Sequence, residues 1–142
     1  MDCEFCDRDG GPVLWRDGFC RIVRAPSQDY AGFCRVILNR HAREMTDLAP
    51  AERARLMVAV FACESALREL FDPDKINLAS LGNLVPHLHW HVIARHADDP
   101  HFPDPIWAVP RRASAPPRAL RNDVSDARLG TRLAALLAQP AA

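Results

Sequence analysis

The stretch His87-Leu88-His89-Trp90-His91-Val92-Ile93 places three histidines at every second position, with large apolar residues between them. Successive side chains of a β-strand point to opposite faces, so a strand would line one face with all three imidazoles. A helix would not, because positions two apart on it diverge by about 200°. We therefore predict a strand over residues 87–95, whose imidazoles lie close enough for metal binding or for proton-transfer and nucleophilic chemistry.

The rest of the chain supplies the other elements of a small sheet. Strand-like apolar stretches cover residues 12–16, 18–24, 32–38 and 75–81, and Asp17-Gly18 is typical of a hairpin turn between the first two. One long helix is predicted from Pro50 to just before Pro73, because apolar residues recur there at three- and four-residue steps. A shorter helix is predicted over residues 124–138.

This order of elements predicts an α+β domain. Short connections between the first three strands favour antiparallel pairing, and the long helix covers one face of the sheet. The imidazoles then occupy part of the other face. We divide the chain into a main domain, residues 1–109, and a proline-rich excursion with the final helix, residues 110–142, packed on the same domain. Residues 98–105 are too proline-rich for regular structure, and His96 and His101 are expected to be solvated loop residues.

Composition and charge limit the classes of partner. The chain has 142 residues, 49% of them apolar and 25% charged, with a formal net charge of zero. No excess of basic charge favours nucleic acid or an anionic membrane, so a nucleotide ligand must be held by local side chains. No apolar run approaches the roughly 20 residues that span a bilayer, and the acidic start of the chain is no signal peptide. We expect a cytoplasmic protein with no nucleic-acid or membrane partner.

Three kinds of chemistry remain open for the alternating histidines. The histidines could be structural residues, ligands of a catalytic zinc ion, or the nucleophile and proton carriers of a covalent mechanism. The zinc arrangement is strained, because residues two apart on a strand are about 6.5–7 Å apart, and no carboxylate lies beside the triad as a base. For the nucleophilic alternative, Gly82 and Asn83 fit a tight turn that would bring backbone N–H groups and an amide toward an anion.

Cys3 and Cys6 form a CxxC pair near the amino terminus. One interpretation is two incidental thiols, and the other is half of a structural zinc site that histidines from elsewhere complete. A thioredoxin-like redox motif is excluded, because no strand-to-helix context surrounds the pair.

The histidine stretch matches the motif His-φ-His-φ-His-φ-φ and resembles the histidine triad (HIT) family, in particular its bacterial dinucleoside polyphosphate (Ap4A) hydrolase-like branch. The resemblance covers residues 1 to about 95, because Cys3-Glu4-Phe5-Cys6, residues 32–41, the long helix and Gly82-Asn83 occur in the family's order. It implies a five-stranded antiparallel sheet with one long helix packed on it, and a homodimer. It also implies that catalysis requires no cofactor, and that a structural zinc ion is held by Cys3, Cys6, His41 and His87.

The resemblance further implies roles for individual residues. His89 would attack the α-phosphate of a nucleotide and form a nucleotidyl-histidine intermediate, while His91 would deliver a proton to the leaving group. His87 would orient His89, in part through its backbone carbonyl. Other residues are expected to contact the substrate: Gly82, Asn83 and Asn77 at the phosphates, Ile22 and Val23 at the base, Asp29 at the ribose, and Trp107 on the side of the leaving group.

Two positions depart from the family pattern. Phe33 stands where many members have a histidine that supports the triad, and Ala25 stands where many have an acidic or amide residue for the ribose. The expected function is a nucleotide hydrolase or transferase acting on a dinucleoside polyphosphate or a nucleoside phosphoramidate. The alternatives are a weakly catalytic nucleotide-binding or interaction protein, which the two departures favour, and a zinc-dependent hydrolase.

Overall fold

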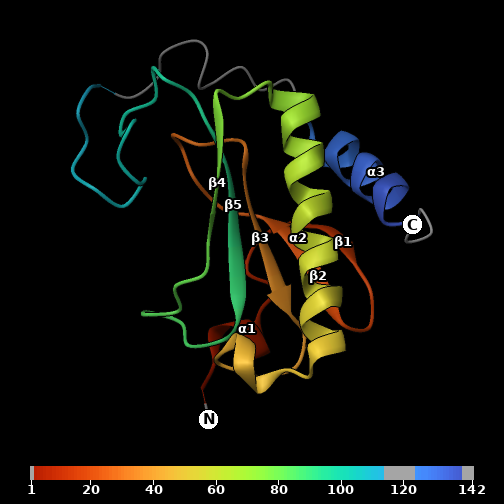
Figure 1. Cartoon of the computed structure of the whole chain (residues 1–142). Helices are drawn as coiled ribbons and strands as arrows, with labels where there is room; N and C mark the ends of the chain where they lie inside the picture. Colours follow the sequence, from red (N-terminus) through yellow and green to blue (C-terminus); the bar gives the residue numbers. More distant parts are fainter. Residues whose placement is uncertain (1, 114–123, 139–142) are drawn as a thin grey trace.

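The structure, a computed structural model, describes residues 2–113 and 124–138 of the chain (Figure 1). The predicted excursion falls mostly outside the described residues, because these omit 114–123. In chain order the elements are α1 Glu4–Asp7, β1 Val13–Arg16, β2 Cys20–Arg24, β3 Phe33–Leu38, η1 Met45–Asp47, α2 Pro50–Phe71, β4 Lys75–Ala79, β5 His89–Arg95 and α3 Asp126–Leu137.

The strands form one five-stranded antiparallel sheet in the order β1-β2-β3-β5-β4, which confirms the predicted α+β fold. The histidine strand β5 lies between β3 and β4, with Arg35 opposite His91 and Ile37 opposite His89. Directly opposed residues of neighbouring strands share a face of the sheet. These side chains therefore point to one side, and alternate residues such as Val92 point to the other.

The long helix α2 covers one face of the sheet (Figure 1). It begins at Pro50, where the Glu52 carboxylate accepts a hydrogen bond from the Ala49 N–H at 2.9 Å and stabilises the first turn. It ends where Asp72 adopts a left-handed conformation, directly before Pro73. Its inward side chains pack on β2, β3 and β5 and build the main core, with Leu56, Val60, Cys63 and Leu67 fully buried.

The final helix α3 packs against α2 and against β1. Ser125 caps its amino terminus, and Leu129 and Leu133 are fully buried. Gly130 faces β1, where a Cβ atom would lie 2.7 Å from the Leu14 carbonyl oxygen, so glycine permits this close approach. Within residues 2–113 and 124–138, none of the helices has both the length and the apolar character needed to cross a membrane.

The two strands nearest the turn before the histidines are shorter than the sequence predicts. β5 begins at His89 rather than at residue 87, and β4 ends at Ala79 rather than at residue 81. Leu88 still bonds through its backbone to the end of β3 and to the loop that follows it. The N–H of His87 instead donates to the Val85 carbonyl at 2.8 Å, so His87 lies in the loop that leads into the strand.

Residues 96–112 contain no helix or strand, which agrees with the prediction for residues 98–105, but the histidines among them are not solvated. His96 and His101 are 5% and 7% exposed, so the prediction of solvated loop residues is wrong. The reason is Asp99, a fully buried carboxylate that accepts hydrogen bonds from Arg95 at 2.8 and 3.0 Å and from the Tyr30 hydroxyl at 3.0 Å. Burial alone would raise the pKa of Asp99, but these donors lower it to about 2. This charged centre holds the loop against the sheet.

Candidate active site

Strand alternation places His89 and His91 on the sheet face that α2 leaves open. Their ring centroids are 4.9 Å apart, their planes are at 85°, and both residues are buried. The Phe5 ring stands edge-on to His89 at 4.9 Å and to His87 at 6.0 Å. The amino-terminal segment therefore covers the histidines from the open side of the sheet.

His87 is held on two sides and also holds its neighbour. Its Nε2 donates to the Leu38 carbonyl at 2.6 Å, and because a carbonyl only accepts, Nδ1 carries the lone pair. This lone pair faces the sulfur atoms of Cys3 at 3.3 Å and Cys6 at 3.5 Å. The backbone carbonyl of His87 accepts a hydrogen bond from Nδ1 of His89 at 2.5 Å.

This last hydrogen bond fixes the tautomer of His89. Since Nδ1 carries the proton, Nε2 carries the lone pair whenever the ring is neutral. Burial lowers the pKa of His89 by more than the hydrogen bond to the His87 carbonyl raises it. His89 is therefore neutral at pH 7, and its Nε2 can act as a nucleophile or as a base.

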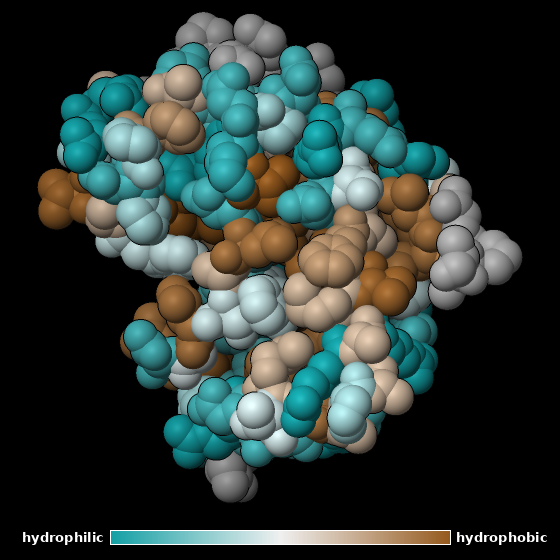
Figure 2. Space-filling view, viewed as in Figure 1, coloured by the Kyte–Doolittle hydropathy of each residue, from teal (hydrophilic) through white to brown (hydrophobic). Residues whose placement is uncertain are grey.

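A cavity of about 460 Å³ opens above the two strand histidines. Its walls include the amino-terminal segment and the loops after β4 and β5, which project on the same side of the sheet in Figure 1. In Figure 2 the surface is indented between these two loops. The lining residues are Glu4, Phe5, Arg35, Leu81, Gly82, Asn83, Leu84, Val85, His89, His91 and Trp107.

Five residues predicted for the site meet around this cavity. Gly82, Asn83 and Trp107 line it together with His89 and His91. Gly82 has a φ of 78°, the left-handed conformation that favours glycine, and it forms the predicted turn. The cavity therefore combines an imidazole whose Nε2 carries a lone pair, a second imidazole, a turn and an aromatic ring.

The expected base pocket in the early strands is not formed. Ile22 points to the face under α2 and is fully buried in the main core. Val23 points to the open face but is fully buried beside Phe5. The amino-terminal segment covers one face of β2 and the helix covers the other, so neither side chain lines the cavity.

Two more residues expected to contact the substrate, Asn77 and Asp29, also lie outside the cavity lining, as does Ala25, which departs from the family pattern. Asn77 is on the open face of β4, but its Oδ1 accepts a hydrogen bond from Arg95 at 2.7 Å. Asp29 lies in the loop before β3 and is half-buried. Ala25, at the family's ribose position, is buried against Phe33. These residues shape the surroundings of the site without facing its cavity.

His91 lies between two aromatic rings. Its ring centroid is 5.0 Å from that of Trp107 and 5.6 Å from that of Phe33. Phe33, at the position of the family's supporting histidine, thus offers a ring contact where a histidine could offer a hydrogen bond. Within the described part of the chain, the buried Nδ1 of His91 has no hydrogen-bond partner. Burial lowers the pKa of His91 to about 4, with contributions from His89 and Arg35.

An NMR titration of the histidines tests this environment. We expect a pKa of about 4 for His91 in the folded protein and about 6.5 in the unfolded chain. The unfolded chain then takes up the proton first, so the stability due to neutral His91 is complete above pH 6.5 and is lost as the pH falls toward 4. His91→Asn should remove this part of the acid dependence. A His91 pKa at or above 6.5 would contradict the buried, neutral arrangement.

A second cluster joins the amino-terminal cysteines to two histidines. The ligand atoms of Cys3, Cys6, His41 and His87 lie within 4.8 Å of one another. Tetrahedral zinc, with bonds of about 2.3 Å to sulfur and 2.0–2.1 Å to nitrogen, sets S···N separations of about 3.6 Å. Three of these separations are 3.3, 3.5 and 3.5 Å here, so the four residues fit the ion. The Leu38 carbonyl orients His87 as a ligand.

Protein atoms would take all four positions of such an ion, which is the pattern of a structural rather than a catalytic zinc site. Among the residues that the structure describes, no potential metal-binding group includes His89 or His91. The geometry therefore gives no support to a zinc-dependent hydrolase built on the triad.

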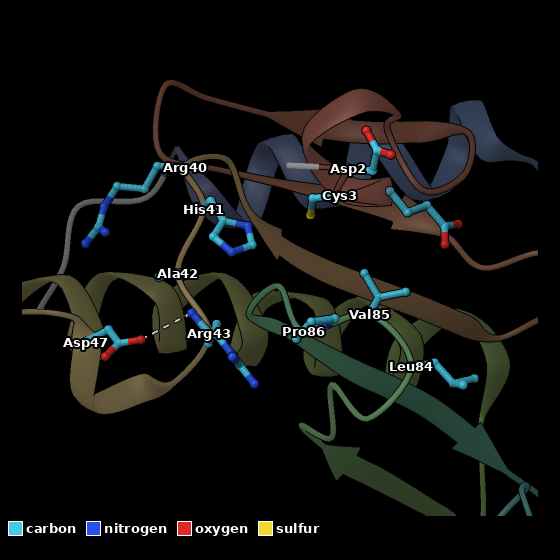
Figure 3. Close-up of a pocket in the computed structure, with 11 residues that line it drawn as sticks. Asp2, Cys3, Arg40, His41, Ala42, Arg43, Asp47, Leu84, Val85 and Pro86 are labelled. Carbon is cyan, nitrogen blue, oxygen red and sulfur yellow. Dashed lines mark hydrogen bonds between the residues drawn. The ribbon is translucent and has the colours of Figure 1, made fainter.

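A larger cavity of about 660 Å³ lies on the other side of the amino-terminal segment (Figure 3). Cys3 and His41 line it, together with Arg40 and Arg43 on the loop after β3 and Asp47 at the end of η1. It shares Glu4, Leu84 and Val85 with the smaller cavity, so these side chains separate the two spaces. His89 and His91 line the smaller cavity and not the larger one, so the candidate site is placed in the smaller cavity.

Sequence reasoning misses six residues that line this cavity, and three of them, Glu4, Phe5 and Arg35, are charged or aromatic. Arg35 does leave a signal, because it is a single charge within an otherwise apolar strand and such a charge needs a partner. Phe5 lies between the two cysteines of the CxxC pair, so the predicted zinc site could have placed it near His87. Glu4 lies between the same two cysteines, so the same reasoning applies to it.

Fold and site together define an α+β protein in which two strand histidines, His89 and His91, line a cavity on the open face of the sheet. The profile of the HIT domain family matches residues 11–98, more than half of the chain. The chain therefore belongs to the HIT family. This family binds nucleotides and includes nucleotide hydrolases.

Solved structures of histidine triad proteins share the fold along nearly the whole chain. One from Sinorhizobium meliloti has a TM-score of 0.70 and 26% identity, covering 95% of this chain and 94% of its own. One from Marinobacter aquaeolei has a TM-score of 0.69 and 27% identity, covering 91% and 90%. One from Bradyrhizobium japonicum has a TM-score of 0.67 and 27% identity, with the same coverage. No curated protein matches the chain.

Proposed function

We propose that the chain is a nucleotide hydrolase or transferase that works through a covalent nucleotidyl-histidine intermediate. The hydrogen bond from Nδ1 of His89 to the His87 carbonyl carries this proposal, because it leaves Nε2 as a neutral nucleophile beside the cavity. Nε2 attacks the α-phosphorus, and the N–P bond forms as the bond to the leaving group breaks. Water or another acceptor then attacks the phosphorus and gives its proton to the now neutral His91, and the N–P bond breaks to restore neutral His89.

His91 supplies the proton in this proposal. Its pKa of about 4 makes it neutral in the free protein at pH 7. A bound phosphate anion raises that pKa, because a nearby negative charge favours the protonated imidazole. His91 then takes up a proton as the substrate binds and gives it to the departing oxygen or nitrogen.

Candidate substrates are dinucleoside polyphosphates and nucleoside phosphoramidates, both of which carry a leaving group on the α-phosphorus. The test is AMP release from Ap4A, adenosine 5′-phosphoramidate and a nucleotide sugar, with intact-mass analysis of the protein at neutral pH. We expect turnover of at least one of the first two, and a mass increase of one adenylyl group at His89 early in the reaction. AMP binding without turnover of any of the three would refute the proposal and favour the weakly catalytic nucleotide-binding protein.

We also propose a structural zinc ion at Cys3, Cys6, His41 and His87. The support is the donor geometry, together with the tautomer of His87, whose Nδ1 lone pair faces both sulfur atoms. The ion would hold the amino-terminal segment against the loop that precedes β5. Phe5 and the His87 carbonyl, which contact His89, would be fixed with it.

The proposal extends to a homodimer in the cytoplasm. β4 is at the edge of the sheet, with no strand on its outer side among the described residues. Val58 and Phe61, on the outer side of α2, are 55% and 52% exposed. Figure 2 shows apolar side chains in the middle of the face of the molecule that carries α2. Both features support association of two copies. A reducing compartment would keep the cysteines available as zinc ligands.

A further inference from the structure

Arg35 is a charged residue of the cavity to which the proposed mechanism gives no role. It lies in the middle of β3, directly opposite His91 of β5, so its side chain stands on the open face of the sheet. It lines the cavity together with His89 and His91. Because a desolvated charge is costly, a guanidinium at the centre of a sheet needs partners.

Arg35 makes fewer hydrogen bonds than Arg21 and Arg95, two other arginines on the same face of the sheet. Arg21 donates four hydrogen bonds to protein oxygens. Arg95 binds the Asp99 carboxylate through two nitrogens and reaches two further oxygens. Arg35 makes one hydrogen bond, to the Gly10 carbonyl at 3.0 Å, and its buried Nε has no partner within the described residues. The terminal nitrogens of Arg35, apart from the one hydrogen that Gly10 accepts, are therefore available as donors to a ligand.

Two aromatic rings fix the position of this guanidinium. Its central carbon is 5.8 Å from the centroid of the Phe5 ring and 5.8 Å from that of the Phe33 ring. Phe5 also contacts His89, and Phe33 also contacts His91. The cation is thus held in a set position relative to both imidazoles.

The charges around the cavity favour an anion next to Arg35. Of the residues that line the cavity, Arg35 and Glu4 are the cation and the anion among the Arg, Lys, Asp and Glu side chains. Glu4 is exposed, so water screens its carboxylate more than it screens the half-buried guanidinium. A phosphate that enters the cavity therefore meets Arg35 as its cation.

We propose that Arg35 binds a phosphate oxygen of the nucleotide substrate. The planar guanidinium matches the geometry of a phosphate, and the flanking rings hold it in place before the substrate arrives. The inference rests on the proposed function, because it names a contact for the same substrate. Stacking of Arg35 on the nucleobase is the competing arrangement, and it predicts a different response to the phosphate-free nucleoside.

The test compares AMP with adenosine as ligands, using calorimetry on the full-length protein. We expect Arg35→Met to weaken AMP binding by about 10- to 100-fold, the effect of losing a charge-assisted hydrogen bond. Adenosine binding should stay unchanged, and the salt dependence of AMP binding should decrease. Arg35→Lys, which keeps the charge but loses the planar donors, should fall between the wild type and Arg35→Met.

A matched control is Arg55→Met. Arg55 also stacks on an aromatic ring, with its guanidinium carbon 4.6 Å from the Phe19 centroid, but it lies on α2 away from the cavity. This variant should bind AMP like the wild type. Should Arg35→Met not fold, Arg35→Gln and Arg35→Lys provide the same comparison.

The outcomes separate this inference from the proposed function. Unchanged AMP binding in Arg35→Met overturns the inference, and so does an equal loss for AMP and adenosine, which indicates a base contact or a structural role. In either case wild-type turnover of the substrates leaves the proposed function intact. A wild-type protein that neither binds AMP nor releases it from any substrate overturns both.

Discussion

Replacing His89 with alanine is expected to lower kcat/KM by at least about four orders of magnitude. The methyl group cannot form the N–P bond, so the covalent route is lost. The cavity walls come largely from the amino-terminal segment and the loops after β4 and β5, so AMP should bind with a Kd close to that of the wild type. Single-turnover assays and calorimetry measure the two quantities separately.

His89→Gly provides the control for this prediction. Added imidazole should fill the space, attack the α-phosphorus in place of the missing side chain and restore turnover in proportion to its concentration. The adenylyl group should then leave on the free imidazole, with no increase in protein mass. Substantial turnover by either variant without imidazole would contradict a histidine nucleophile at this position.

The second large effect concerns the proposed structural zinc ion. Cys6→Ser is expected to lose bound zinc and to melt about 8–16 °C below the zinc-loaded wild type. At a free zinc concentration of about 1,000 times Kd, the ion contributes about 4.1 kcal/mol, and 1 kcal/mol changes Tm by about 2–4 °C for chains of this size. Cys6 is exposed, so exchange of sulfur for oxygen disturbs little packing and the change in Tm reports the metal. Elemental analysis and thermal melting measure both effects.

A chelator completes the comparison. It should lower the Tm of the wild type to that of Cys6→Ser and leave the variant unaffected. Asp7→Ser, a neighbouring exposed change that removes no ligand, should keep zinc and respond like the wild type. Wild-type protein without zinc above background, or with a Tm insensitive to chelation, would remove the structural zinc from the proposal.

The features that could be predicted from the sequence are those that depend on local periodicity. The alternation around His89 and His91 predicts one shared face, because a strand has a period of two residues wherever it is placed. The apolar spacing of α2 predicts the helix and its inward side in the same way. His87 shows the limit, since its spacing fits the strand while its backbone bonds locally to Val85.

The features that could not be predicted depend on contacts between distant parts of the chain. Asp99 collects donors from Arg95 and Tyr30, and this draws His101 inside although its own surroundings read as a solvated loop. The covering of β2 by the amino-terminal segment removes the expected pocket at Val23. Neither contact leaves a repeating pattern in the sequence, because each depends on how separate segments pack.

The contact between Cys3 and His87 joins residues 84 positions apart, and the cavity wall continues to Trp107. During synthesis on the ribosome, the first ligands of the cluster therefore emerge long before their partners. The contacts that hold His87 and His89 against the amino-terminal segment cannot form until the chain has grown past β5, and contacts of such sequence separation form slowly. A fusion partner at the amino terminus would begin next to Cys3, one of the proposed zinc ligands.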